Sequence, residues 1–251
     1  ASALPLRIFD AAYDGKMREV AAWLAQGGSV NALHADQERL FGGAMLMGAA
    51  GNGQEAMVRM LLQRSASVDL QEDKAGVTAL LLAAGKGFTA IVRMLLDAKA
   101  SINLPGRTGA TPLLFATTLG HTSTVELLLR YSANTDVQDN SKGGTALMAA
   151  AAEGHAPVVQ LLLDAKADDT LRNINGETAL EIAEIREDPA AAKLLRRHAQ
   201  PPPPPAPAPA PTAEAVASAL PLRIYNAACS GDVREVAAWL AQGGSINALH
   251  A

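Results

Sequence analysis

The chain has 251 residues, of which 49% are hydrophobic but only 4% aromatic, and its formal net charge is −4. That charge provides no basic field of the kind that holds nucleic acid, so we expect no nucleic-acid partner. The single cysteine excludes an internal disulfide framework, and no stretch approaches the ~20 apolar residues that a membrane-spanning helix needs. We therefore expect an intracellular protein, cytoplasmic or nuclear, with no membrane partner.

A sequence unit that we expect to be helical occurs first near the N-terminus, and further copies of it recur at nearly constant spacing. The opening stretch, LRIFDAAYDGKMREVAAWLAQGGSVN, is a degenerate first copy, and AMLMGAAGNGQEAMVRMLLQRSASVD from Ala44 is a weaker second one. Four clearer copies begin at Thr78, Thr111, Thr145 and Thr178, so that these threonines lie 33, 34 and 33 residues apart. Such a period is typical of solenoid proteins, in which each unit contacts only its neighbours.

Each copy is predicted to form two short helices joined by a turn glycine. The first helix, of the TALxxAA type, is too short to be stable alone in water. The second carries apolar residues at i, i+3 and i+4, as in Val92, Leu95 and Leu96, and these form one apolar stripe. Because no copy can close a core by itself, stacking must bury the stripes against neighbouring copies. We therefore predict an all-α helical solenoid of about six helix–turn–helix repeats.

A longer turn separates the first two copies. The segment HADQERLFGG lengthens the spacing between their turn glycines to 38 residues. Leu40 and Phe41 are apolar residues in this turn, where a polar surface is expected. Two interpretations stay open: the two side chains tuck under the loop, or they form an exposed contact.

The sixth copy has the features of a terminal repeat. REDP replaces its turn glycine, and Pro189 is placed to begin the second helix. Lys193, Arg196, Arg197 and His198 lie on its outer face, near a helix C-terminus where positive charge is favoured. A solvated cap is the preferred interpretation, and a basic docking patch is the alternative.

The end of the chain consists of a linker followed by a second copy of the opening stretch. The prolines of PPPPPAPAPAP at residues 201–211 fix φ and lack the amide donor, so we expect a polyproline II spacer rather than a ligand for a proline-reading domain. Residues 217–251 then repeat residues 1–35 with seven differences. We predict an array over 1–200, a Pro/Ala-rich linker over 201–216, and the first repeat of a truncated second array over 217–251.

The near-identity of the two copies points to a recent duplication, and we expect the full gene product to continue with another array. A lone repeat has no stacking partner and should not be stable by itself. We expect a monomer. A domain-swapped dimer, in which the tail copy docks in place of the first copy on another molecule, is the open alternative.

The copies resemble a known family. The pattern T-P/A-L-x-x-A-A-x-x-G-H, followed by x-V-V-x-L-L-L-x-x-x-A at a 33-residue period, resembles the ankyrin repeat from Leu6 to about Ala199, and again from Leu222 to Ala251. The family's histidine after T-P-L, which usually ties neighbouring turns, is replaced in four copies by Leu81, Leu114, Met148 and Glu181. We therefore expect a somewhat looser array.

The resemblance implies a protein–protein interaction module or scaffold that binds a partner on the concave surface of the array. It places the contacts around the turn before each threonine and at the two residues before each turn glycine. On the turns these are Lys74, Val77, Arg107, Thr108, Lys142, Asn175 and Glu177. On the first helices they are Tyr13, Asp14, Asn52, Lys86, Thr118, Leu119 and Glu153.

Other interpretations of the same array remain. Each predicted contact residue could be an ordinary solvated side chain. The array could be the targeting arm of a larger enzyme, of the kinase or ubiquitin-ligase type, whose catalytic domain lies outside this sequence. It could also be a mechanical spacer without a high-affinity partner.

No pattern indicates catalysis, so we expect no enzyme activity, no cofactor, no metal and no catalytic residue. GNGQEA and GKGFTA match the local G-x-G-x-x-A dinucleotide pattern, but they recur one repeat apart at a turn that the solenoid needs anyway. The histidines lie on different copies without cysteine or carboxylate at metal-ligand spacing. His121 and His155 are expected to be structural residues at the start of second helices.

Overall fold

The computed structural model describes residues 4–34, 43–199, 224, 227 and 230–241. Six helix pairs follow one another across residues 4–34 and 43–199. The first helices are α1 (Leu6–Tyr13), α3 (Met45–Gly51), α5 (Ala79–Lys86), α7 (Pro112–Thr118), α9 (Ala146–Ala152) and α11 (Ala179–Ile185). The second helices are α2 (Met17–Ala25), α4 (Glu55–Gln63), α6 (Thr89–Asp97), α8 (Thr122–Arg130), α10 (Ala156–Asp164) and α12 (Pro189–Ala199).

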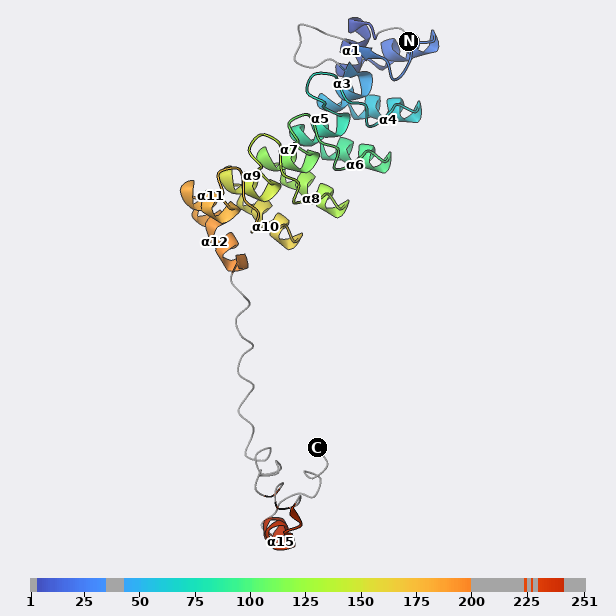
Figure 1. Cartoon of the computed structure of the whole chain (residues 1–251). Helices are drawn as coiled ribbons and strands as arrows, with labels where there is room; N and C mark the ends of the chain where they lie inside the picture. Colours follow the sequence, from blue (N-terminus) through green and yellow to red (C-terminus); the bar gives the residue numbers. More distant parts are fainter. Residues whose placement is uncertain (1–3, 35–42, 200–223, 225–226, 228–229, 242–251) are drawn as a thin grey trace. The chain divides into compact units, whose positions relative to one another are not determined.

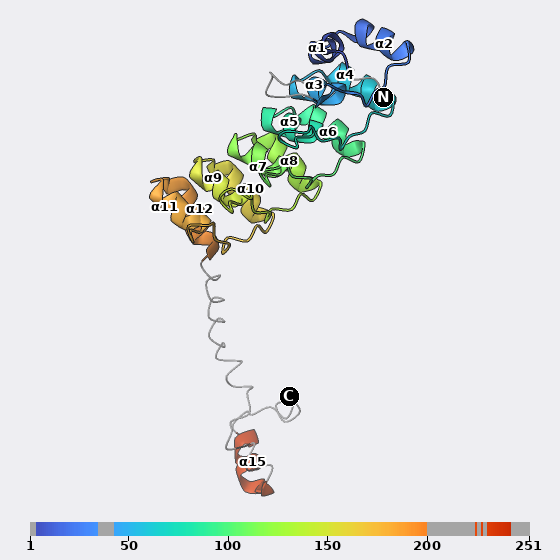
Figure 2. The same cartoon turned by 45° about the horizontal axis from the view of Figure 1, so that its top comes forward.

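The chain divides into two compact units, Ala1–Gln200 and Pro201–Ala251, and the second contains α15 (Val233–Ala241). In the first unit, the first helices lie side by side in one row and the second helices in another (Figures 1 and 2). Successive helices are in contact from α1 to α11 along the first row and from α4 to α12 along the second. The predicted all-α repeat array is therefore confirmed. The linker residues 201–216 lie outside the described residues.

The threonine that opens each clear copy is a helix N-cap. The side-chain oxygens of Thr78, Thr111, Thr145 and Thr178 each accept a hydrogen bond from the backbone N–H three residues later. Such a cap satisfies one of the free donors at a helix start and contributes about 1 kcal/mol. The T-A-L and T-P-L patterns therefore set where the first helices begin.

The predicted apolar stripes form a continuous core. Two residues from the stripe of each central second helix have no exposed surface: Val58 and Leu61, Val92 and Leu95, Val125 and Leu128, Val159 and Leu162. Each fully buried side chain of this kind contributes about 1.5–3 kcal/mol. Alanines of the first helices, such as Ala83 and Ala84, are equally buried and allow neighbouring helices to approach closely.

A short strand pair closes the base of the long turn between the first two repeats. β1 (Leu33–His34) pairs antiparallel with β2 (Gly43–Ala44). The Nδ1 atom of His34 lies 2.8 Å from the Leu4 carbonyl oxygen, and its ring stacks on Phe9 at 5.9 Å. Nothing in the sequence pattern indicated this pair. Leu40 and Phe41 belong to residues 35–42, which lie outside the described residues, so their two interpretations stay untested.

An Asn or Asp at the end of each of the first four repeats bonds to the next repeat. Each side-chain Oδ1 accepts a hydrogen bond from a backbone N–H one repeat later. The pairs are Asn31 with Ser67 (2.8 Å), Asp69 with Ser101 (2.8 Å), Asn103 with Asn134 (2.9 Å) and Asp136 with Asp168 (2.9 Å). These bonds add directional register to the apolar stacking, which is itself non-directional.

The basic residues of the last repeat are exposed. Pro189 begins α12, and two of the four basic residues on the outer face have acidic partners. Arg196 pairs with Glu184 at 2.7 Å, and Nδ1 of His198 lies 2.9 Å from Asp169. These internal pairs reduce the positive charge that a basic docking patch would offer.

Two residues after the end of each of four second helices, a non-glycine residue adopts the left-handed backbone conformation. Ser65, Lys99, Ser132 and Lys166 have φ between 61° and 68°, whereas Gly27 holds the equivalent position of the first repeat. A side chain there costs about 1–2 kcal/mol, because its Cβ crowds the following carbonyl. The array therefore carries local strain at the end of each central repeat.

We predict that replacing Lys99 or Lys166 by glycine stabilises the array by about 1 kcal/mol, because glycine adopts positive φ without this crowding. Urea denaturation followed by circular dichroism measures the free energy of unfolding. As a control, the same substitution at Lys193, inside α12, should destabilise the array by about 1 kcal/mol. Destabilisation at positions 99 and 166 as well would contradict the account.

Candidate functional site

The residues predicted to contact a partner occupy two rows along the array. Seven lie in the turns before the first helices. The other seven lie at the far ends of the first helices: Tyr13, Lys86 and Thr118 are last residues of helices, and Asp14, Asn52, Leu119 and Glu153 are C-caps. A helix of seven or eight residues separates the rows by about 11 Å. We call the two rows and the helix strip between them the turn face.

Backbone hydrogen bonds join the turns of neighbouring repeats into a ladder. In each bond, an N–H near a turn tip donates to a carbonyl of the preceding turn. The pairs are Arg107 to Ala75 (2.9 Å), Asn140 to Thr108 (2.8 Å) and Ile174 to Lys142 (2.9 Å). Three predicted contact residues thus supply ladder groups with their backbones, which fixes the backbone positions from which their exposed side chains project.

Two glutamine side chains reinforce the ladder. Nε2 of Gln71 donates to the carbonyls of Gly76, in its own turn, and Pro105, in the next, at 2.8 and 2.9 Å. Gln138 repeats this arrangement with Gly143 and Arg172, at the same two distances. These amides connect neighbouring turns in an array that lacks the family's usual histidine tie.

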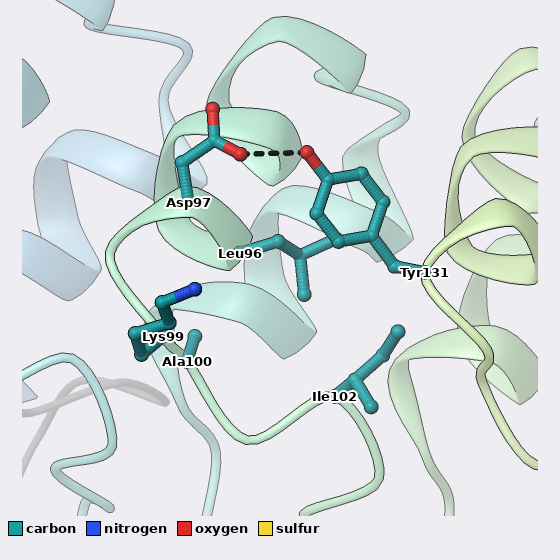
Figure 3. Close-up of a pocket in the computed structure, with 6 residues that line it drawn as sticks. All are labelled: Leu96, Asp97, Lys99, Ala100, Ile102 and Tyr131. Atoms are coloured by element: carbon teal, nitrogen blue, oxygen red, sulfur yellow. Dashed lines mark hydrogen bonds between the residues drawn. The ribbon is translucent and has the colours of Figure 1, made fainter.

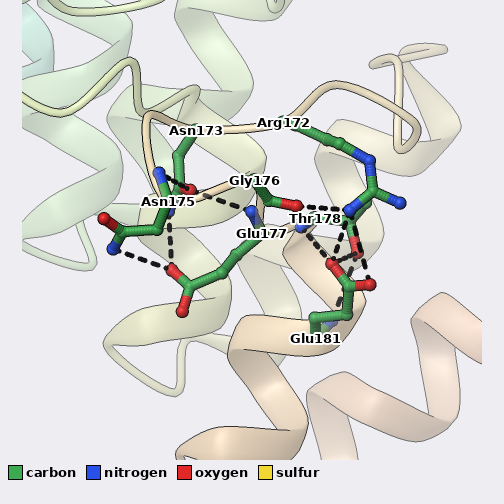
Figure 4. Close-up of polar contacts among 7 residues, drawn as sticks. All are labelled: Arg172, Asn173, Asn175, Gly176, Glu177, Thr178 and Glu181. Carbon is green, nitrogen blue, oxygen red and sulfur yellow. Dashed lines mark hydrogen bonds and ion pairs between the residues drawn. The ribbon is translucent and has the colours of Figure 1, made fainter.

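The last turn has no following turn and is closed by its own side chains (Figure 4). Arg172, at the position of Gln138, donates to the Gly176 carbonyl and pairs with Glu181 at 3.1 Å. Glu181 and Thr178 form a reciprocal capping box at the start of α11. The backbone N–H of Thr178, then its hydroxyl and Arg172, hold the pKa of Glu181 below its ordinary value. The end of the ladder is therefore well satisfied.

The predicted contact side chains differ in availability. Lys86, Lys142 and Glu153 are exposed and, within the described residues, make no side-chain hydrogen bond or ion pair. Leu119 is 55% exposed. Four of the remaining predicted residues are engaged in side-chain hydrogen bonds. Arg107 donates to the Asp73 carbonyl, Asn52 to that of Tyr13 and Thr118 to that of Leu114, and Glu177 accepts from Asn173 and Asn175 (Figure 4).

Val77 differs from the other predicted contact residues, because only 8% of its surface is exposed. It directly precedes the capping Thr78 and joins the buried start of the first helix. The position before each threonine was expected to face a partner, but here an apolar side chain turns inward. Val77 therefore offers almost no surface for binding.

The strip between the two rows is partly apolar. Leu82 packs over Gly51 and Phe115 over Gly85, since a Cβ added to either glycine would lie 3.5 or 3.6 Å from these side chains. Both large side chains remain partly exposed. The turn face thus combines an apolar floor with charged and polar borders.

Two exposed isoleucines on the turn face were missed from the sequence. Ile174 is 73% exposed at the turn position that Arg107 holds two repeats earlier, and Ile185 is 65% exposed at the last position of α11. Aligning every turn by its ladder position would have identified Ile174. Ile185 escaped because the sixth repeat has Glu187 where the others have the turn glycine.

His121 and His155 are structural residues, as expected. Nε2 of His121 lies 3.1 Å from the Gly85 carbonyl, and Nε2 of His155 lies 3.2 Å from that of Thr118. Each histidine is the N-cap residue of a second helix and bonds to the preceding repeat. The two G-x-G-x-x-A segments begin within the last turns of α3 and α5, whereas a dinucleotide fingerprint follows a strand.

An open pocket of about 380 Å³ lies between the ends of α6 and α8 (Figure 3). It is lined by Leu96, Asp97, Lys99, Ala100, Ile102 and Tyr131. The Tyr131 hydroxyl donates to Asp97 at 2.6 Å, and this hydrogen bond is the main cause that raises the pKa of Tyr131. The Tyr131 hydroxyl and the Asp97 carboxylate bond to each other across two repeats, so the pocket forms part of the stacking interface.

Across the residues that the structure describes, no group of three or more His, Cys, Asp or Glu side chains is placed to hold a metal ion. No helix in the same part of the chain has the length and apolar character needed to cross a bilayer.

The carboxylate of Asp139 holds the turn that presents Lys142. Burial alone would raise the pKa of Asp139. Hydrogen bonds from the Ser141 hydroxyl and from the backbone N–H groups of Lys142, Ser141 and Gly144 outweigh it and hold the pKa below its ordinary value. The ionised form is therefore favoured in the folded state.

Comparison with known proteins agrees with this geometry. A family model described as ankyrin repeats, in three copies, matches residues 8–106, 46–139 and 113–202, which together cover most of the chain. No curated protein matches the sequence.

We predict that Asp139→Asn lowers the stability of the array at neutral pH, and that the difference from the wild type shrinks in acid. A carboxylate with a depressed folded-state pKa stabilises above its unfolded pKa of about 3.9. That stabilisation is lost as pH falls through the lower folded-state value. Urea midpoints of both proteins from about pH 7 to about pH 3 measure the difference. A gap that stays constant with pH would contradict the assignment.

Proposed function

The chain belongs to the ankyrin-repeat family, and we propose that its array binds a protein partner on the turn face, as an interaction module or scaffold. Ankyrin repeats serve as protein–protein interaction modules. The proposed role is one of binding rather than catalysis. The turn face corresponds to the concave surface on which the resemblance placed the partner.

The observation that carries this proposal is the hydrogen-bonded ladder of turns. Bonds of 2.8–2.9 Å join successive turns, and the two glutamines bridge them a second time. The ladder holds the backbone of the turns in place before binding. A partner then pays little backbone ordering entropy on the side of the array, which favours affinity at a given contact area.

The charged side chains of the turn face would favour a partner of complementary charge. Lys74, Lys86, Arg107 and Lys142 are exposed along the third to fifth repeats, while Glu153 lies towards the C-terminal end. Complementary charges accelerate encounter and exclude wrong partners more than they add affinity. We therefore expect binding that weakens with ionic strength.

The test replaces those four cations by alanine in the full chain. A pull-down from lysate of the source cells, read by mass spectrometry, identifies proteins that the wild type retains. For each retained protein, titration calorimetry should show that the variant binds at least about tenfold more weakly, because four complementary charges are lost.

The matched control removes four exposed cations from the second helices and the position that follows α4: Arg59, Arg64, Arg93 and Lys193. It changes the net charge by the same amount and leaves the turn face intact. Wild-type affinity in this control, with loss in the first variant, supports the turn face. Equal binding by both variants and the wild type would place the partner elsewhere.

A further inference from the structure

Two turns of the turn face direct a carboxylate inward and a lysine outward. Glu72 is only 4% exposed, and its carboxylate accepts hydrogen bonds from the backbone N–H groups of Lys74, at 2.8 Å, and Ala75. Asp139 has the same role two repeats later, where three backbone N–H groups, including that of Lys142, donate to it at 2.7–2.9 Å. The side chains of Lys74 and Lys142 are exposed. The negative charges therefore stabilise the turns from within, and the positive charges face outward.

Arg107 adds a cation in the turn between these two. Its Nη2 atom donates to the Asp73 carbonyl at 2.6 Å, and its backbone N–H donates to Ala75, so that the guanidinium lies against the preceding turn. Lys86 is exposed on the other row, at the end of α5. Against these four cations, the described turns at residues 71–77, 105–110 and 138–144 hold one exposed acidic residue, Asp73. This part of the turn face is therefore cationic, although the chain as a whole has a net charge of −4.

Apolar side chains adjoin the last of these cations. The N–H of Ile174 donates to the Lys142 carbonyl at 2.9 Å, and a Cβ added to Gly143 would lie 3.5 Å from the Ile174 side chain. Ile174 is 73% exposed in its turn, and Ile185 is 65% exposed at the far end of α11. Ile182, three residues before Ile185, is partly exposed as well. Single exposed apolar residues are common, but several that share one face with cations mark a surface for binding.

The chemistry of these two regions restricts the partner. A basic segment would be repelled by the four cations. A wholly apolar segment would remove the cations from water without supplying opposite charges, which costs free energy. A segment that carries both carboxylates and apolar side chains satisfies both regions.

We propose that the occupant of the turn face is an acidic protein segment. Its carboxylates contact the four cations, and its apolar side chains cover Ile174 and Ile185. This inference rests on the proposed function and adds the chemical class of the partner to it.

The overall charge of the chain favours a single site for such a segment. Because the chain is acidic overall, its mean field repels an acidic segment, and the cationic part of the turn face attracts it. Electrostatic attraction of this kind directs the encounter and weakens as salt screens it.

A library of random peptides displayed on phage tests the class of the partner. The full chain is immobilised, and the bound peptides are sequenced after repeated selection. We expect the selected peptides to contain at least about twice as many Asp and Glu residues as the unselected library, because these residues complement the cations. Apolar residues should be enriched beside them. The consensus peptide is then synthesised, and titration calorimetry measures its Kd.

Substitutions locate the contacts of that peptide. Replacing the four cations by alanine should weaken binding at least about tenfold. The control that replaces Arg59, Arg64, Arg93 and Lys193 should retain wild-type affinity.

The apolar contacts have their own variant. Ile174→Ser combined with Ile185→Ser should also weaken binding at least about tenfold, because apolar contact is lost. Val233→Ser, at an exposed position of α15, is the control and should leave Kd unchanged. Circular dichroism verifies that each variant is folded.

The possible results separate this inference from the proposed function. Neutral or basic peptides that lose affinity in the four-cation variant would overturn the acidic partner and leave binding at the turn face intact. Acidic peptides that bind both four-residue variants equally well would overturn the turn face as the site, and the proposed function with it. Selection of no peptide, or tighter binding of a single-stranded RNA homopolymer than of the consensus peptide, would overturn an acidic protein segment as the occupant.

Discussion

Stacking of neighbouring repeats completes the core of this array, because each helix packs on the adjacent repeats as well as on the other helix of its own repeat. The helices, the turns and the turn face all depend on this interaction. α2 and α15 share an identical run of residues, yet Val20 is completely buried in the array and its counterpart Val236 is only partly covered. Sequence alone does not decide whether such a helix has a core.

Polar groups then convert the stack into a regular surface. The apolar core fixes no register by itself, whereas the bonds from Asn31, Asp69, Asn103 and Asp136 tie each repeat to the next at one defined position. The ladder of turns does the same for the backbone from which the exposed side chains of the turn face project. The proposed binding function follows from this order: the same bonds that hold the array together also preorganise the residues that a partner would meet.

Features that recur with the repeat period were predictable from the sequence. The threonine caps, the paired helices and the buried valine–leucine stripes each occur several times, so that one ambiguous copy is corrected by the others. The strand pair at Leu33–His34 occurs once, and it depends on a partner nine or more residues away. The inward turn of Val77 and the exposure of Ile174 depend on local packing at single turns. Periodicity carries no information about such individual positions.

Hydrogen exchange of α2 and α15, resolved by NMR, tests most directly whether stacking rather than sequence stabilises these helices. The two helices share residues 18–25 and 234–241, so their intrinsic exchange rates are matched. Stacking predicts that the amides of α2 exchange at least about a hundredfold more slowly than those of α15, because Val20 of α2 is completely buried in the array whereas Val236 of α15 is only partly covered. Equal protection of the two helices would contradict the account.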